Sequence, residues 1–234
     1  MRPIRTVAAS LTPGAVLAYR SLPLVIVLGA CVSLAAMART GTVEGTVVLE
    51  PMQQPPVGAM YRTGTRAPVL EPDPPRAIVY LEREDGHYPP AGGRDLVTVS
   101  QRGYQFRPAL VAVPTGAKVA FPNRDDEFHN VFSYSSIKRF DLGRFRKDEE
   151  SPLVTFDAPG VARVYCEIHK HMRSLVLVLD TPWYTATDTG GNYTLENVPP
   201  GRYTLRAFLP SARTLESPVT VESNRTVRVD LGEP

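Results

Sequence analysis

The stretch Cys166-Glu-Ile-His169-Lys-His-Met172 brings a thiol, two imidazoles and a thioether into seven residues. It follows the segment Val161-Ala-Arg-Val-Tyr165, in which apolar and polar residues alternate. Side chains two apart share a face of a strand, so Ala162, Val164 and Cys166 should point the same way, toward a core. The pattern therefore predicts that Cys166 lies at the inward end of a strand, where the strand opens into a loop.

A second imidazole-bearing loop lies upstream, in Asp125-Asp-Glu-Phe-His129-Asn130. Two imidazoles, one thiolate and a weak axial thioether form the ligand set of an electron-transfer copper site. We therefore predict one mononuclear type 1 copper centre, with His129, Cys166, His169 and Met172 as ligands. An alternative is a zinc site in which His171 replaces Met172 as the fourth ligand, because thioether is not a usual zinc ligand.

The rest of the chain indicates an all-β protein. Proline makes up 23 of 234 residues, and long helices tolerate it poorly. Short β-signals separated by turns recur from about Leu96 to Asp180 and again from Thr181 to the end. Earlier strand-like segments at Gly41–Leu49 and Ala77–Leu81 flank a proline-rich stretch, which predicts an extended loop.

The middle of the chain, from about Val97 to Leu179, resembles the cupredoxins, particularly the amicyanin and plastocyanin type, and exported proteins associated with methylamine utilisation. The resemblance rests on Pro122-Asn-Arg-Asp-Asp-Glu-Phe-His129-Asn130-Val131 and on Asp157-Ala-Pro-Gly160…Tyr165-Cys166-x-x-His169-x-x-Met172. It implies a Greek-key β-sandwich with His129, Cys166 and His169 as equatorial ligands and Met172 as axial ligand. It also implies that Asn130 ties the two ligand loops together, and that electrons pass through an exposed edge of His169.

The C-terminal region resembles a carboxypeptidase regulatory-like or transthyretin-like β-sandwich. The markers are Thr187-Asp188-x-x-Gly191-x-Tyr193 and Pro199-Pro-Gly201-x-Tyr203-x-Leu205. The opening strands of that family are matched by Gly41–Val47 and Ala77–Leu81, on the other side of the copper-binding segment. We therefore predict domains at 39–85 and 181–234 that together form this smaller sandwich, with a cupredoxin domain at 94–180 inserted between them. The alternative assigns the first strands to the cupredoxin sheet.

The N-terminus is typical of an export signal, predicted at 1–38. Three arginines precede an apolar run from Leu22 to Ala36, and Ala36-Met-Ala38 supplies small residues for cleavage. The alternatives are an uncleaved anchor and lipidation at Cys31, since Leu28-Gly-Ala-Cys31 resembles a lipobox. We expect a periplasmic protein, or a lipid-anchored one at the membrane surface, with no membrane span in the mature chain unless it is lipidated.

These features predict a carrier of single electrons between redox protein partners, and no enzyme. Four histidines are too few for the extra copper sites of an oxidase or a nitrite reductase. A net charge of +2 gives no general attraction for nucleic acid. The basic run Lys138–Lys147 precedes Asp148-Glu-Glu150, which indicates a solvated loop of mixed charge. The alternatives are a copper-binding protein for carriage or storage, and a β-sandwich binding module without redox function.

Overall fold

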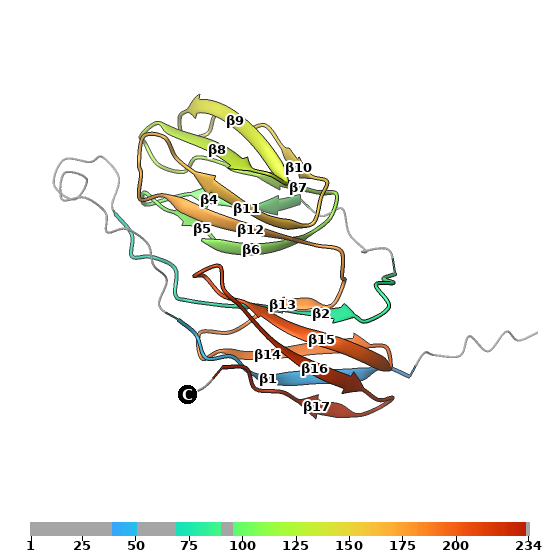
Figure 1. The fold of residues 1–234 in the computed structure, drawn as a ribbon. Helices are drawn as coiled ribbons and strands as arrows, with labels where there is room; N and C mark the ends of the chain where they lie inside the picture. The colour runs from blue at the N-terminus through green and yellow to red at the C-terminus, as the bar shows by residue number, and fades with distance from the viewer. Residues whose placement is uncertain (1–38, 51–68, 90–95, 233–234) are drawn as a thin grey trace, which may run out of the picture. The chain divides into compact units, whose positions relative to one another are not determined.

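The computed structural model describes residues 39–50, 69–89 and 96–232, and every regular element in these ranges is a β-strand. The strands form two β-sandwiches (Figure 1). The prediction of an all-β fold with a larger and a smaller sandwich is therefore confirmed.

The larger sandwich contains ten strands between Leu96 and Leu179. A five-stranded sheet has the order β6-β12-β11-β8-β9, a three-stranded sheet has the order β10-β7-β3, and β4 pairs with β5. The bounds are β3 Leu96–Thr98, β4 Ser100–Gln101, β5 Phe106–Arg107, β6 Leu110–Pro114, β7 Ala117–Ala120, β8 His129–Ser135, β9 Lys138–Phe145, β10 Val154–Phe156, β11 Gly160–Tyr165 and β12 Arg173–Leu179.

The core of the larger sandwich collects the inward faces of both sheets. Val119 and Phe156 of the smaller sheet cluster with Val131, Val164 and Val176 of the larger one. Each of these side chains is at most 1% exposed, so each gains most of the free energy that burial of its apolar surface can supply.

Strand β11 shows the alternation that the sequence predicts. Ala162 and Val164 are fully buried, whereas Arg163 between them is exposed. The strand ends at Tyr165, and Cys166, on the same face as Val164, is 3% exposed. The predicted inward position of Cys166 at the strand exit is therefore confirmed.

The apolar strand β12 is buried on both faces. Val176 and Val178 belong to the core of the larger sandwich. Leu177 and Leu179 instead join a separate cluster with Ile78, Tyr80 and Phe208. The second cluster explains why this strand lacks the polar alternation seen in β11.

The smaller sandwich combines two early strands with five late ones. Its sheets have the orders β14-β1-β17 and β13-β2-β15-β16. The bounds are β1 Gly41–Thr46, β2 Ile78–Arg83, β13 Tyr184–Ala186, β14 Asn192–Val198, β15 Gly201–Phe208, β16 Thr214–Val221 and β17 Thr226–Arg228. Strand β1 pairs antiparallel with β14 and parallel with β17, and β2 pairs with β13 and β15. This is the pairing that the insertion hypothesis requires.

The marker residues of the smaller sandwich have clear structural roles. Asp188 accepts hydrogen bonds from the backbone N–H groups of Gly190 and Asn192, both at 2.8 Å, and so closes the turn before β14. Gly191 in that turn has φ +84°, and a Cβ there would lie 2.2 Å from the carbonyl oxygen of Val47. Tyr203 donates its hydroxyl to the carbonyl oxygen of Pro199 at 2.8 Å. These contacts explain why the motif has these residues at this spacing.

Several predictions concern residues outside the described ranges. These are the export signal at 1–38 with Cys31, and most of the proline-rich stretch, from residue 51 to 68. Across the parts of the chain that the structure describes, no helix has the length and apolar character needed to cross a membrane.

The position of Gly45 in β1 provides a test of the strand pairing. A Cβ at this residue would lie 1.8 Å from the backbone oxygen of Val229. The variant Gly45→Ala should therefore lower the free energy of unfolding by about 2 kcal/mol, because backbone must shift to make room. Urea unfolding measures the change, with Glu44→Ala on the same strand as control. Equal stability of Gly45→Ala and the wild type would contradict this packing of β1.

Candidate metal centre

Three of the predicted ligands converge in the larger sandwich. His129 is the first residue of β8, Cys166 directly follows β11, and His169 lies in the loop before β12. The potential ligand atoms of the three side chains all lie within 4.8 Å of one another. The residues are 0%, 3% and 4% exposed, respectively. The fold thus gathers one thiol and two imidazoles, 40 positions apart in sequence at most, into a buried cluster.

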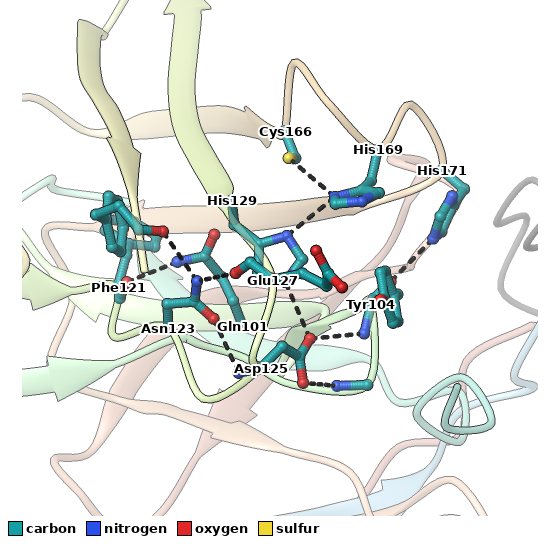
Figure 2. Close-up of polar contacts among 12 residues, drawn as sticks. Gln101, Tyr104, Phe121, Asn123, Asp125, Glu127, His129, Cys166, His169 and His171 are labelled. Carbon is teal, nitrogen blue, oxygen red and sulfur yellow. Dashed lines mark hydrogen bonds and ion pairs between the residues drawn. The ribbon is translucent and has the colours of Figure 1, made fainter. Parts of the chain in front are cut away.

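The Nδ1 atoms of the two imidazole rings lie close to each other and to the thiol. His129 Nδ1 lies 3.0 Å from His169 Nδ1, and Cys166 Sγ lies 3.7 Å from His169 Nδ1 (Figure 2). Three donor atoms thus point toward a common region. Their proximity is the arrangement in which one metal ion could accept a lone pair from each of them.

The outer nitrogen of His129 is held by a carboxylate that the sequence did not single out. His129 Nε2 lies 2.9 Å from Asp125 Oδ2, and Asp125 is 3% exposed (Figure 2). Asp125 stands four residues before His129 in an irregular loop, where this spacing carries no structural signal. Only the folded loop shows that the two side chains meet.

A second neighbour that sequence reasoning missed is Tyr104. Its ring is 1% exposed and packs edge-on against both imidazoles, with ring centroids 5.8 Å from His129 and 5.0 Å from His169. Tyr104 and Gly103 have φ values of 60° and 65°, and the backbone N–H groups of both donate to Asp125, at 3.0 and 2.7 Å. Consecutive N–H groups in such a turn form a pocket for an anion, which here is the Asp125 carboxylate.

Asn130 connects the two loops that carry the ligands. Its side-chain Oδ1 accepts a hydrogen bond at 3.3 Å from the backbone N–H of Glu167, the residue after Cys166. Its amide group donates to Asp141 Oδ1 at 2.7 Å and to the carbonyl oxygen of Gly143 at 3.1 Å. The side chain thus links the start of β8 to β9 and to the loop that follows Cys166.

The two candidates for a fourth ligand have different surroundings. Met172 is fully buried in the core with Cys166, and its backbone closes the loop: its N–H donates to His169 O at 2.9 Å, and its carbonyl accepts from Cys166 N at 3.4 Å. His171 lies outside the three-residue cluster, and its Nε2 is 3.1 Å from the carbonyl oxygen of Tyr104. Burial lowers the pKa of His171, which favours the neutral ring.

The cluster favours an ionised thiol. Burial raises the pKa of Cys166, but hydrogen bonds from His129, His169 and the backbone of Asn130 and His169 outweigh burial and lower the pKa to about 6. For His129 burial lowers the pKa, but the contacts with Asp125 and Cys166 outweigh burial, and the net pKa is raised. Thiolate is the form of cysteine that binds metals, so Cys166 could serve as a ligand for a soft metal ion.

The surface near the cluster differs in two respects from the sequence prediction. The expected exposed edge of His169 is small, since the residue is 4% exposed and Tyr104 packs against its ring. The basic run at 138–147, predicted as a loop, lies largely on β9. Its mixed charge is as predicted, with Lys138, Arg144 and Lys147 each paired with a carboxylate at 2.9–3.1 Å. Exposed pairs of this kind contribute little to stability.

Residues 174–232 match the carboxypeptidase regulatory-like domain family. No curated protein matches. Among solved structures, a Cu-containing nitrite reductase from Thermus scotoductus is 26% identical, with 36% of this chain and 22% of that chain covered and a TM-score of 0.34. Two oxidised single-residue variants of amicyanin are 22% and 23% identical, cover 37% and 39% of this chain and 85% and 90% of theirs, and both have TM-scores of 0.34.

The family match describes part of the smaller sandwich. It covers β13 to β17 and begins at Ser174, within β12, which the structure pairs with β11 and β6 of the larger sandwich. Strands β1 and β2, which complete the two sheets, lie far upstream of the matched segment. The carboxypeptidase regulatory-like assignment of the C-terminal region is thereby supported.

The ionisation of Cys166 can be measured directly on the metal-free protein. We expect the ultraviolet absorbance of the thiolate to appear with a midpoint at about pH 6, whereas an ordinary thiol ionises at about 8.5. The Cys166→Ser variant supplies the baseline, because Cys166 is the free cysteine of the described residues. A midpoint at or above the ordinary value would show that the imidazoles do not stabilise the thiolate.

Proposed function

We propose that this chain is a type 1 copper protein that carries single electrons between redox partners. The observation that carries the proposal is the buried convergence of His129, Cys166 and His169, with Nδ1 of both imidazoles beside the thiol. Met172 closes the same loop by backbone hydrogen bonds and would supply the axial thioether.

The chemistry of the donors favours copper over other metals. Thiolate and thioether sulfur prefer soft ions such as Cu(I), while imidazole suits Cu(II) as well. A bound copper ion would supply a one-electron couple between these two states. A zinc site would need a fourth nitrogen, sulfur or carboxylate ligand, and the nearest imidazole, His171, already contacts the carbonyl oxygen of Tyr104.

The protein's own contribution would be to hold the donors still and to exclude water. His129 is held at Nε2 by Asp125, and Cys166 is fixed at the end of β11 by the core around Val164. The closed environment reduces the rearrangement that accompanies a change of charge, because few solvent molecules and few side chains need to reorient. Low reorganisation is the property that a carrier of electrons needs.

Localisation and partners are part of the proposal. Cys166 is the one cysteine among the described residues. A lone cysteine suits an oxidising compartment when its sulfur is a metal ligand, which agrees with the export signal expected at 1–38. We propose a periplasmic carrier that catalyses no reaction of its own and exchanges electrons with redox proteins.

The central test is the visible spectrum after Cu(II) is added to the chain from Arg39 onward. We expect an intense blue thiolate-to-copper charge-transfer band and one equivalent of bound copper. The Cys166→Ser variant should lose the band, and His129→Ala should weaken or abolish it, since each removes one donor of the cluster.

His171→Ala is the matched control, because this buried imidazole neighbours the cluster without belonging to it. A colourless wild-type protein with tightly bound zinc would refute the electron carrier and favour a structural site. Tight Cu(I) binding without a blue Cu(II) form would instead favour copper carriage or storage. Failure to bind either metal would favour a β-sandwich binding module.

The fourth ligand is tested by paired variants. Met172→Leu keeps most of the buried volume but removes the thioether, so we expect the blue band to persist and the reduction potential to rise, because a donor to Cu(II) is lost. His171→Ala should leave the potential close to that of the wild type. Cyclic voltammetry or a redox titration measures both. A large shift in His171→Ala with none in Met172→Leu would identify His171 as the fourth ligand.

A further inference from the structure

We propose that Asp125 is a positioning residue for the metal centre: it fixes the ring of His129 with Nδ1 directed at the cluster, and its fixed negative charge favours the oxidised metal. The inference deepens the proposed function and rests on it. Its geometric part concerns the metal-free protein, where it can be tested separately.

The first step is the acceptor character of Asp125. An ionised carboxylate only accepts hydrogen bonds. Here its two oxygens accept the N–H groups of Gly103 and Tyr104, and Oδ2 also lies beside Nε2 of the His129 ring. The 2.9 Å contact with the carboxylate therefore places a hydrogen on His129 Nε2. In the neutral ring the lone pair then resides on Nδ1, on the side of Cys166 and His169.

The second step is the rigidity of the loop around Asp125. Asn123 is 1% exposed, and its side-chain Oδ1 accepts a hydrogen bond from the backbone N–H of Asp125 at 2.9 Å. The side-chain amide of Asn123 donates to the carbonyl oxygen of Glu127 at 2.8 Å (Figure 2). It also donates to the carbonyl oxygen of Phe145 at 3.0 Å. Asp125 is thus held from its own backbone, and its carboxylate is held by the turn at Gly103 and Tyr104. Because both its backbone and its carboxylate are held by hydrogen bonds, Asp125 cannot turn away from His129. It therefore sets the orientation of the His129 ring.

The third step is electrostatic. Among the described residues, the ion-pair partner of Asp125 is His129, whereas the neighbouring Asp126 pairs with Lys147 at the surface. If a metal ion bound to Nδ1 of His129, Asp125 would be a buried anion on the opposite side of the same imidazole ring. Charge interactions are screened less in the interior than in water, so this anion stabilises Cu(II) more than Cu(I). It also makes the imidazole a stronger donor.

The test compares Asp125→Asn with the wild type. Asparagine keeps the size of the side chain and removes the charge. We expect Cu(II) affinity to fall about 10–100-fold, as is usual when a hydrogen-bond partner of a ligating histidine is removed, with a smaller loss of Cu(I) affinity. Each tenfold difference between the two losses raises the reduction potential by about 59 mV. Asp126→Asn removes a charge from the same loop at an exposed position and should leave the potential nearly unchanged.

Nuclear magnetic resonance of the metal-free protein supplies a readout independent of copper. In the wild type and in Asp126→Asn, His129 should show a slowly exchanging Nε2–H proton, and this signal should shift or disappear in Asp125→Asn. An Nε2 without hydrogen in the wild type would overturn the positioning role, even if copper binds. Equal losses of Cu(I) and Cu(II) affinity in Asp125→Asn would overturn the electrostatic role. A protein that shows the Nε2–H proton but binds no copper would refute the proposed function and leave the geometry intact.

Discussion

The arrangement of the site depends on one constraint: a thiol at the end of β11 is buried with two imidazoles, and these polar groups must satisfy one another. An unpaired buried polar group costs about 1–3 kcal/mol. The cluster avoids this cost by pairing His129 with Asp125, Asp125 with backbone N–H groups, and Cys166 with imidazole nitrogens. The hydrogen bonds that make burial tolerable also lower the pKa of Cys166 to about 6. The contacts that satisfy the buried thiol are therefore the same contacts that favour its ionised form.

The sequence was sufficient for the parts of the site that local pattern determines. Alternation in β11 predicted the inward position of Cys166, and the short loop that follows fixed His169 near it. The roles of Asp125 and Tyr104 were not predicted, because they depend on contact between two loops that lie 21 residues apart in sequence. The left-handed backbone at Tyr104 is also unusual for a residue with a side chain, so nothing local predicts the turn. The exposure of His169 was overestimated for the same reason, since the ring of Tyr104, from another loop, packs against it.

The fold shows the same division between local and long-range information. Strand β1 was recognised from Gly41–Val47, and its pairing with β14 and β17 follows from motifs on both sides of the larger sandwich. The strand character of Lys138–Phe145 was missed because its charges read as a solvated loop. In the structure β9 pairs with β8 alone, at the edge of the five-stranded sheet, where charged side chains reach solvent and discourage pairing with other chains. A charged edge strand therefore resembles a loop when only its composition is considered.

The burial of both imidazoles has a consequence for how the proposed carrier would exchange electrons. A well-shielded centre keeps solvent away and its donors fixed, yet it lengthens the path to a partner. Here the ring of Tyr104 packs edge-on against His169, and the backbone N–H of Tyr104 donates to Asp125. Asp125 in turn holds His129. In the proposed carrier, a change at Asp125 would therefore act on the ligand geometry and on the packing of Tyr104 against His169 together.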